Sequence, residues 1–152
     1  MKKINFLLLL AGMLTLLASC SNNGKRYDYN KNQNVYYKGD GLDEAAAKKL
    51  ANYLAEIQYF GSDKALTVQI TKTPETKDTV NINFVIDKTK VTPMYDSLFI
   101  KIGGFISNKV YEGKPVNVNY IDEYFAKVKS LGFAPPLTEE GSPAASKESG
   151  VQ

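Results

Sequence analysis

Few residue types in this chain could carry chemistry, and the types that are absent limit it strongly. The sequence contains a single cysteine, Cys20, and no histidine. Without histidine there is no Ser-His-Asp triad, no Cys-His pair and no imidazole ligand for zinc or haem. A single thiol cannot build a thiolate metal site or an internal disulfide. Any reaction in the rest of the chain would depend on carboxylates, lysines, tyrosines or hydroxyls.

The adjacent acids Asp122 and Glu123 could serve as an acid–base pair, as in a small carboxylate-based cell-wall hydrolase. Adjacent acids at the start of an expected helix are better explained by capping and by the helix dipole. The chain lacks a glycine-rich phosphate loop, a G-x-S-x-G elbow and an S-x-x-K motif. We therefore expect a non-catalytic protein without a metal or a cofactor, and hydrolysis is the third alternative.

Cys20 follows a segment with the pattern of a secretory signal. Lys2 and Lys3 precede a mostly apolar run over residues 4–17. A membrane-spanning helix needs about twenty apolar residues, so this run is short for one. The pattern predicts a signal peptide over residues 1–19.

The residues Leu17-Ala18-Ser19-Cys20 resemble the lipobox of bacterial lipoproteins, a resemblance that covers residues 1–20 only. In that family the thiol receives a diacylglyceryl group, and the chain is cut before the cysteine and usually acylated there. The resemblance implies a lipid anchor at Cys20, and two or more acyl chains hold a protein firmly at a membrane. Ser21, in place of an inner-membrane-retaining aspartate, points to the outer membrane and to a domain facing the periplasm.

Composition divides the rest of the chain into three parts. Residues 20–34 are polar and aperiodic, which predicts a lipidated cysteine followed by a flexible tether. Residues 35–134 suffice for a single small domain. Residues 135–152 are rich in proline, serine, glycine and glutamate, which predicts a disordered tail. The 19 basic and 16 acidic residues are interleaved, so nucleic acid is not an expected partner.

Hydrophobic periodicity predicts an α+β domain with the element order α-β-β-α-β-α. Asp43 suits an N-cap of the first helix, and Thr92-Pro93 suits the start of the second. Gly103-Gly104 inside the second helix indicates close approach of another backbone or a kink, with a hinge or ligand contact as the alternative. The expected elements are a helix over 44–57, an antiparallel hairpin of strands 66–72 and 79–86, a helix over 93–110, a strand over 116–120 and a helix over 122–131.

The strands alternate between apolar and polar residues. A sheet with one apolar and one polar face is covered by helices on one side only. We therefore expect a two-layer sandwich with a mainly antiparallel sheet, helices on one face and the other face open to water. The polar positions of the strands are Thr67, Gln69, Thr71, Asn81, Asn83, Asn117 and Asn119.

Amide and hydroxyl groups on an open sheet face could hydrogen-bond a small ligand or a glycan. The candidate ligand-binding residues are Thr67, Gln69, Asn81, Asn83, Asn117 and Asn119. The alternative is an ordinary solvated sheet surface, although asparagine is depleted in strands. A second candidate is the tyrosine-rich approach, and its alternative is a short edge strand with linker residues. Its members are Lys25, Arg26, Tyr27, Tyr29, Tyr36 and Tyr37.

The sequence thus favours a membrane-anchored periplasmic lipoprotein that binds a partner protein or another component of the cell envelope. The alternative is a lipoprotein that binds a small ligand or a glycan on its polar sheet face.

Overall fold

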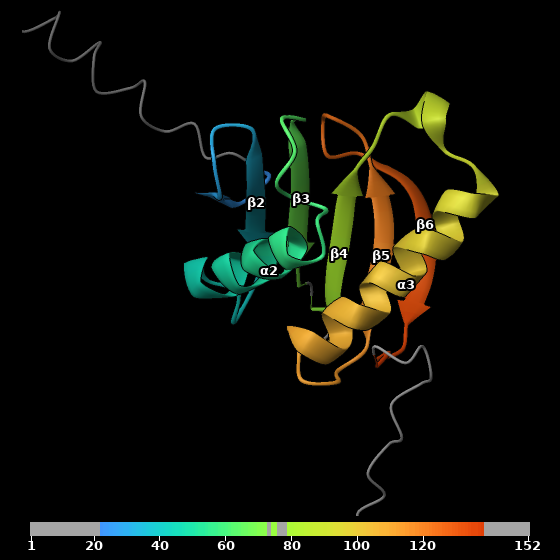
Figure 1. Cartoon of the computed structure of the whole chain (residues 1–152). Coiled ribbons are helices and arrows are strands. Elements are labelled where there is room, and N and C mark those ends of the chain that lie inside the picture. The colour runs from blue at the N-terminus through green and yellow to red at the C-terminus, as the bar shows by residue number, and fades with distance from the viewer. Residues whose placement is uncertain (1–21, 73, 76–78, 139–152) are drawn as a thin grey trace, which may run out of the picture.

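The computed structural model describes residues 22–72, 74–75 and 79–138, which form a six-stranded sheet with two α-helices (Figure 1). A short 3-10 helix, η2 (Lys88–Lys90), precedes the second α-helix. The helices are α2 (Glu44–Glu56) and α3 (Pro93–Lys109), and the strands are β1 (Lys25–Asp28), β2 (Gln33–Lys38), β3 (Leu66–Thr71), β4 (Val80–Val85), β5 (Val116–Ile121) and β6 (Lys127–Ala134).

The strands lie in the sheet in the order of the chain, β1-β2-β3-β4-β5-β6. The pairs β2–β3 and β4–β5 are parallel, and α2 and α3 are their respective crossovers. The other three pairs are antiparallel. Two β-α-β units therefore stand side by side, joined by the β3–β4 hairpin.

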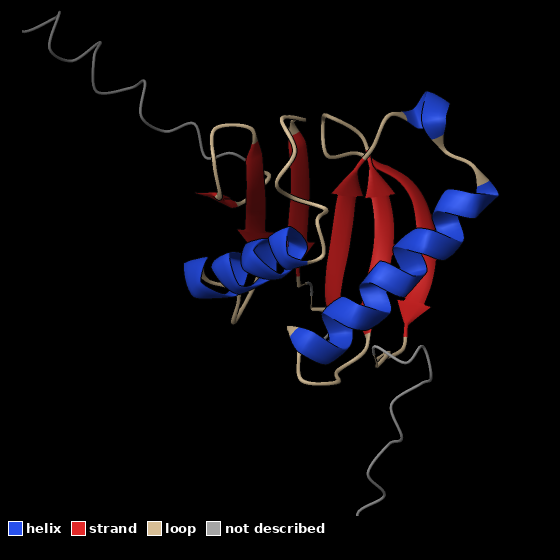
Figure 2. Cartoon of the chain, in the orientation of Figure 1, coloured by secondary structure: helices blue, strands red, loops and turns tan. Residues whose placement is uncertain are grey.

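The two crossovers have opposite hands. Figure 2 shows both helices on the same side of the sheet, while β4 runs antiparallel to β3. This arrangement makes β4-α3-β5 right-handed and β2-α2-β3 left-handed, although about 98% of such crossovers are right-handed. The side-chain pattern gives the reason, because a right-handed crossover would have put α2 on the polar face of the sheet.

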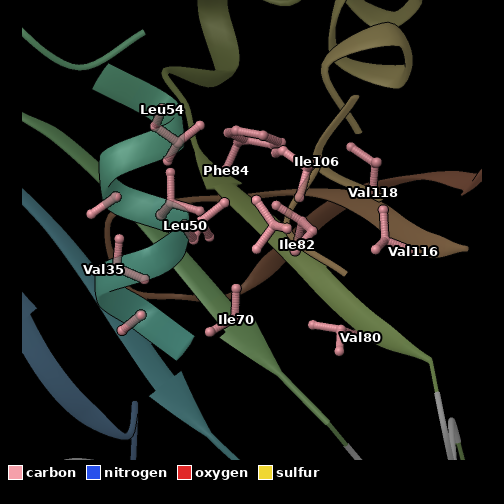
Figure 3. Close-up of a cluster of buried hydrophobic side chains, with 14 of the residues drawn as sticks. Val35, Leu50, Leu54, Ile70, Val80, Ile82, Phe84, Ile106, Val116 and Val118 are labelled. Atoms are coloured by element: carbon pink, nitrogen blue, oxygen red, sulfur yellow. The ribbon is translucent and has the colours of Figure 1, made fainter. Parts of the chain in front are cut away.

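The core lies between the helices and the apolar face of the sheet (Figure 3). Leu50 and Leu54 of α2 and Ile106 of α3 are fully buried there. Phe99 of α3 packs edge-on against Phe84 and Tyr120, with ring centroids 4.6 and 5.3 Å apart. The strands contribute Val35, Tyr37, Val68, Ile70, Val80, Ile82, Phe84, Val116, Val118 and Tyr120.

Gly103 and Gly104 let α3 approach the rest of the fold closely. A Cβ atom at Gly103 would lie 2.4 Å from Val118 Cγ2 and 2.9 Å from the Cβ of Ala134. A Cβ atom at Gly104 would lie 2.6 Å from Leu137 Cγ. The glycine pair thus serves close packing, mainly against side chains of the sheet and of the segment after it.

The expected helices and strands between residues 44 and 121 are present. Asp43 caps α2, because its Oδ1 accepts a hydrogen bond from the Ala46 backbone nitrogen at 2.8 Å. The 66–72 and 79–86 segments form an antiparallel hairpin, the second helix begins at Pro93, and β5 follows at Val116. The prediction of a mixed α and β domain is confirmed.

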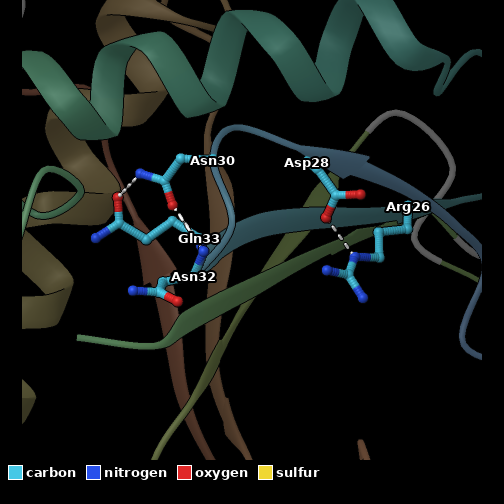
Figure 4. Close-up of polar contacts among 5 residues, drawn as sticks. All are labelled: Arg26, Asp28, Asn30, Asn32 and Gln33. Atoms are coloured by element: carbon cyan, nitrogen blue, oxygen red, sulfur yellow. Dashed lines mark hydrogen bonds and ion pairs between the residues drawn. The ribbon is translucent and has the colours of Figure 1, made fainter. Parts of the chain in front are cut away.

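The prediction of a flexible tether up to residue 34 is wrong for its described part. Lys25–Asp28 forms β1, and Gln33 and Asn34 begin β2. Asn30 makes the connecting turn, because its Oδ1 accepts from the backbone nitrogens of Asn32 and Gln33 at 2.9 and 2.8 Å (Figure 4). The polar residues that resembled a linker are therefore turn-forming residues of a hairpin.

The buried side chain of Gln33 fastens this hairpin to the loop after α2. Its Nε2 donates to the carbonyl oxygen of Ser62 at 2.7 Å, and its Oε1 accepts from the Gly61 nitrogen at 2.8 Å. Asn30 Nδ2 donates to the same Oε1 at 2.8 Å (Figure 4). A linker residue would make no such buried network.

The predicted helix over residues 122–131 is wrong. Asp122 Oδ1 accepts from the backbone nitrogens of Tyr124 and Ala126, which closes a turn, and Lys127–Ala134 is strand β6. Two register shifts in the β5–β6 pairing break the alternation by which a strand is recognised. The order is therefore β-β-α-β-β-α-β-β, and not α-β-β-α-β-α.

The ordered part of the chain also extends beyond the predicted boundary at residue 134. The backbone nitrogen of Leu137 donates to the Gly104 carbonyl oxygen at 3.0 Å, so the start of the predicted tail lies against α3. Residues 139–152, the predicted signal peptide over 1–19 and Cys20 lie outside the described residues. Within the described ranges, each helix is too short or too polar to cross a membrane.

Candidate functional site

The six predicted ligand-binding residues lie together on the sheet face opposite the core, in three rows that cross the strands. Gln69, Asn83 and Asn119 occupy the middle row. Asn81 and Asn117 form the second row, next to Thr71. Thr67 belongs to the third row. The β3–β4 register, continued one residue beyond the pair Val68–Phe84, places Thr67 opposite Val85.

The amides of the middle row bind one another in a single direction, and we call this chain the amide ladder (Gln69, Asn83 and Asn119). Asn119 Nδ2 donates to Asn83 Oδ1 at 2.9 Å, and Asn83 Nδ2 donates to Gln69 Oε1 at 3.0 Å. Gln69 Nε2 then donates to the carbonyl oxygen of Asn23 at 2.9 Å. In the second row Asn117 Nδ2 donates to Asn81 Oδ1 at 3.1 Å. The amides of both rows therefore already form hydrogen bonds with one another.

The expectation of a wet second face is wrong at the amide ladder, whose residues are only 3–7% exposed. The main chain of Asn23 lies at one end of the ladder. Tyr36, the neighbour of Gln69 in β2, contacts the ring of Phe125 edge-on at 4.8 Å. The turn after β5 thus folds back toward β2. Hydrogen bonding between the amides takes the place of water.

The tyrosine-rich approach is divided between the two faces. Tyr27 lies opposite Val35, and Tyr37 lies opposite Ile70, so both are on the core side. Tyr36 is on the polar face, where the Arg26 guanidinium lies 5.9 Å from its ring centroid. Tyr29 follows the end of β1 and lies with its ring centroid 5.8 Å from that of Phe60, so the tyrosines do not converge on one site.

The sequence signal for the ladder is a repeat that the periodicity analysis missed. Val80–Val85 reads VNINFV and Val116–Ile121 reads VNVNYI. The repeats pair in register across β4 and β5, so that each asparagine lies beside its counterpart. In-register pairing of like residues is the geometry that produces amide ladders.

A cavity of about 180 Å³ opens near the N-terminal end of α3, and sequence analysis did not find it. It lies beyond the carboxyl ends of β4 and β5, where ligands bind to parallel strands. No motif marks it, because its lining comes from separate segments. The lining residues are Ile86, Asp87, Lys90, Val91, Tyr95, Phe99 and Tyr120.

Large apolar side chains of α3 are exposed beside this cavity. Met94 is 74% exposed, Leu98 is 49% exposed and Tyr95 is 41% exposed. We call these three residues and the cavity the α3 patch. Leu98 lies four residues after Met94 and three residues after Tyr95, so it is the neighbour of both on the surface of the helix.

Three ion pairs lie near the α3 patch. Lys90 Nζ lies 3.3 Å from Asp87 Oδ2, and Lys129 Nζ donates to Asp96 Oδ2. Lys88 Nζ lies 2.8 Å from Asp122 Oδ2. These three pairs carry no net charge.

The Tyr120 hydroxyl and Asp96 Oδ1 are both buried near this cavity, and the two groups lie close enough to interact with each other. Burial, then the negative charge of Asp96 and a hydrogen bond to its carboxylate, raise the pKa of the Tyr120 phenol, so the hydroxyl keeps its proton. A protonated phenol and a carboxylate oxygen offer one donor and one acceptor.

The acids that suggested hydrolysis do not form a catalytic pair. Asp122 holds the turn after β5, while Glu123 is exposed. The hydrogen bond from Lys88 is the main cause that lowers the pKa of Asp122, whereas a catalytic acid needs a raised one. The described residues hold no cluster of three potential metal ligands.

A second cavity, of about 190 Å³, lies at the opposite end of the sheet, between the start of α2 and the end of α3. Lys72, Lys114 and Tyr111 are among its lining residues. The hydroxyl of Tyr111 is buried without a partner among the described residues. Its position beside the amino ends of β4 and β5 separates it from the α3 patch.

Comparison with curated proteins gave no significant match, and comparison with solved structures gave none either. Residues 27–132 match the model of the AF_1994_N family, which is described as a family N-terminal domain. That match spans the sheet from β1 into β6 together with both helices. The chain belongs to the AF_1994_N family.

Proposed function

We propose that this protein is a non-catalytic binding module that docks a partner protein of the cell envelope on the α3 patch. A lipid on Cys20 anchors it in the outer membrane, with the two-layer domain facing the periplasm. The observation that carries the proposal is the exposure of Met94 and Leu98 on α3, each directly before a residue that lines the apolar cavity (Tyr95 and Phe99).

The composition of the α3 patch suits a protein interface. Exposed apolar surface beside a pocket is typical of an interaction site, and methionine adapts its shape to a partner. Interfaces gain most of their affinity from a few side chains that fill pockets, surrounded by contacts that exclude water. The cavity can receive such an anchor, and Met94 and Leu98 can supply the surrounding contacts.

The charge distribution favours an apolar protein segment as the occupant. In the ion pairs Lys90–Asp87 and Lys129–Asp96, each basic side chain near the patch is neutralised by an acid. A phosphate-rich or strongly acidic partner would need unpaired basic residues. An uncharged segment loses no ionic interaction when it docks here.

Site-specific cross-linking in cells tests the docking surface. A photoreactive amino acid placed at position 98 should give a discrete product with another envelope protein. The same amino acid at Asn52, an exposed position of α2, is the matched control and should not give that product. Met94→Lys in the position-98 variant should abolish it. Products equal at both positions, or only between copies of this chain, would overturn the proposal.

The anchor is tested separately. Cys20→Ala should release the processed domain or leave an unprocessed precursor, and it should not unfold residues 22–138. Fractionation and mass spectrometry would measure both. A Cys20→Ala protein that still fractionates as an acylated membrane protein would contradict the assignment.

A second candidate function is glycan binding on the polar face, which one observation favours. Phe133 is 65% exposed and lies opposite Asn117 in the β5–β6 pairing. An exposed ring beside amides is a surface on which a sugar can stack. Binding of purified peptidoglycan strands should then be lost in Phe133→Ser and kept in Leu98→Lys. Equal binding by both variants would reject this candidate.

A further inference from the structure

We propose that the lipidated domain lies directly on the membrane, with the end of the sheet at which the chain enters the fold facing the phospholipid headgroups. This inference rests on the proposed function, since it needs the lipid on Cys20. It follows from the contacts that hold the chain against the domain almost as far back as that cysteine.

The chain is fixed to the domain from Asn22 onward. The carbonyl oxygen of Asn22 accepts a hydrogen bond from Lys38 Nζ at 2.9 Å. The carbonyl oxygen of Asn23 accepts from the amide ladder, also at 2.9 Å. Gly24 has a φ of +96°, and a Cβ atom there would lie 2.4 Å from the carbonyl oxygen of Tyr37, so the main chain packs closely on β2.

The connection between the domain and the lipid is therefore very short. Cys20 lies two residues before Asn22, and an extended chain spans at most about 3.6 Å per residue. The Cα atoms of Cys20 and Asn22 can thus be no more than about 7 Å apart. Because the acyl chains lie in the membrane, a connection of this length holds the domain at the headgroups.

Lysines surround the point at which the chain enters the domain. Lys38 contacts Asn22, and Lys25 is the first residue of β1. Lys72 follows β3, and its backbone nitrogen donates to the Lys38 carbonyl oxygen at 3.0 Å. Anionic headgroups attract lysines close to the membrane surface. The nearest acids along the chain follow β2, in the next loop and at the start of α2: Asp40, Asp43 and Glu44.

This orientation leaves the α3 patch accessible to a partner. Lys38 ends β2 and Lys72 follows β3, so the membrane-facing end of the sheet holds the carboxyl ends of these two strands. Because β4 is antiparallel to β3 and β5 is parallel to β4, the same end holds the amino ends of β4 and β5. The α3 patch lies beyond their carboxyl ends, and it therefore points away from the membrane.

Fluorescence quenching by labelled headgroups tests the orientation. The full-length lipoprotein is placed in vesicles of phosphatidylethanolamine and phosphatidylglycerol, in which some lipids carry a nitroxide on the headgroup. Since Cys20 is acylated, one introduced cysteine accepts the fluorophore: Asp40→Cys at the membrane-facing end, or Lys64→Cys at the other end of β3. The six residues of β3 separate these positions by about 20 Å, so quenching should be at least about fivefold stronger at position 40.

Two changes identify the causes of this orientation. A Gly-Ser linker of about twenty residues before Asn22, with an r.m.s. length of roughly 25 Å, should reduce the ratio of quenching to less than about twofold. Lys25→Glu with Lys72→Glu should reduce the quenching at position 40 by at least about half. Lys31→Glu with Lys101→Glu makes the same change of charge at exposed positions elsewhere, and it should leave the quenching unchanged.

The outcomes separate this inference from the proposed function. Mass spectrometry shows whether Cys20 is acylated, and an unmodified cysteine would overturn both the anchor and the orientation. An acylated protein with equal quenching at positions 40 and 64, or with quenching that the linker does not change, would overturn the orientation alone. Equal effects of the two charge-reversed double variants would also overturn it. Stronger quenching at position 40, weakened by the linker and by Lys25→Glu with Lys72→Glu only, is the supporting result.

Discussion

Removal of the central amide of the ladder should destabilise the domain more than removal of a similar amide nearby. In Asn83→Ala, Asn119 Nδ2 loses its acceptor and Gln69 Oε1 loses its donor. Both partners belong to residues less than 8% exposed. A buried polar group left unpaired costs about 1–3 kcal/mol. Water entering the vacated space recovers part of this, so we expect a loss of about 2–4 kcal/mol in the free energy of unfolding.

Asn81→Ala is the matched control, since Asn81 is the same residue type on the same face of β4, two positions away. Asn81 is half-buried, and its own bonds to Thr71 are long, at 3.4 Å. Water can replace the acceptor that Asn117 loses, so the expected cost is below about 1 kcal/mol. Urea unfolding followed by far-UV circular dichroism would give both free energies.

A double variant tests whether the ladder acts as a unit. The double variant Asn83→Val with Asn119→Val removes both the acceptor and the donor of the bond between these two residues. Neither group is then left unpaired, so the loss of unfolding free energy should be at least about 1 kcal/mol smaller than the sum of the losses in Asn83→Val and Asn119→Val alone. Costs that add, or an Asn83→Ala cost no larger than that of Asn81→Ala, would refute the explanation based on buried hydrogen bonds.

Three further substitutions test other features of the fold. Gly103→Ala should destabilise the domain by about 1–3 kcal/mol, because the new Cβ would lie 2.4 Å from Val118 Cγ2. This clash outweighs the gain of about 1 kcal/mol in helix propensity. Urea unfolding would measure the difference. Gln33→Leu should cost about 2–4 kcal/mol by the same assay, because the Gly61 nitrogen and its neighbours lose a buried partner. Asp122→Asn keeps the Oδ1 acceptor but loses the ion pair with Lys88. Because the folded protein lowers the pKa of Asp122 from its ordinary 3.8, this variant should be less stable than the native protein above that pH, and the difference should vanish in stronger acid. A difference that persists well below that pH would contradict the ion-pair explanation, and pH-dependent unfolding would show it.

Sequence periodicity found the central elements because their signals are long and local. Helix α2 has a capping aspartate, Asp43, and a complete apolar stripe. Strands β3 and β4 alternate between apolar and polar residues except at Val85, so their hairpin could be predicted. Strand β6 was missed because its register shifts disturb the alternation, and because Asp122 and Gly132 imitate helix-end signals. Strand β1 has four residues, too few for a period to show.

The candidate site was predictable only in part, for a physical reason. Alternation placed Asn83 and Asn119 on one face, but it could not show that their amides bind each other, since register between distant strands is not a local property. The cavity brings Ile86, Tyr95 and Tyr120 together from three segments. Hydrogen-bond satisfaction at Tyr120 and Asp96 likewise depends on the complete fold. The local sequence pattern thus predicts which side chains share a face of the sheet, whereas the hydrogen bonds and the cavity depend on contacts between distant segments.

The similar sequences of β4 and β5 create a risk of aggregation, which the fold must prevent. Stacking of like segments in parallel register is also the arrangement by which separate chains assemble into amyloid fibrils. Each of these strands could therefore pair with the same strand of another molecule if its edge were exposed. In the native domain β3 and β6 occupy the outer edges of the pair, so neither template is accessible. Detachment of β6, whose pairing with β5 is irregular, would open one of them, which makes this C-terminal strand a safeguard against chain-to-chain polymerisation.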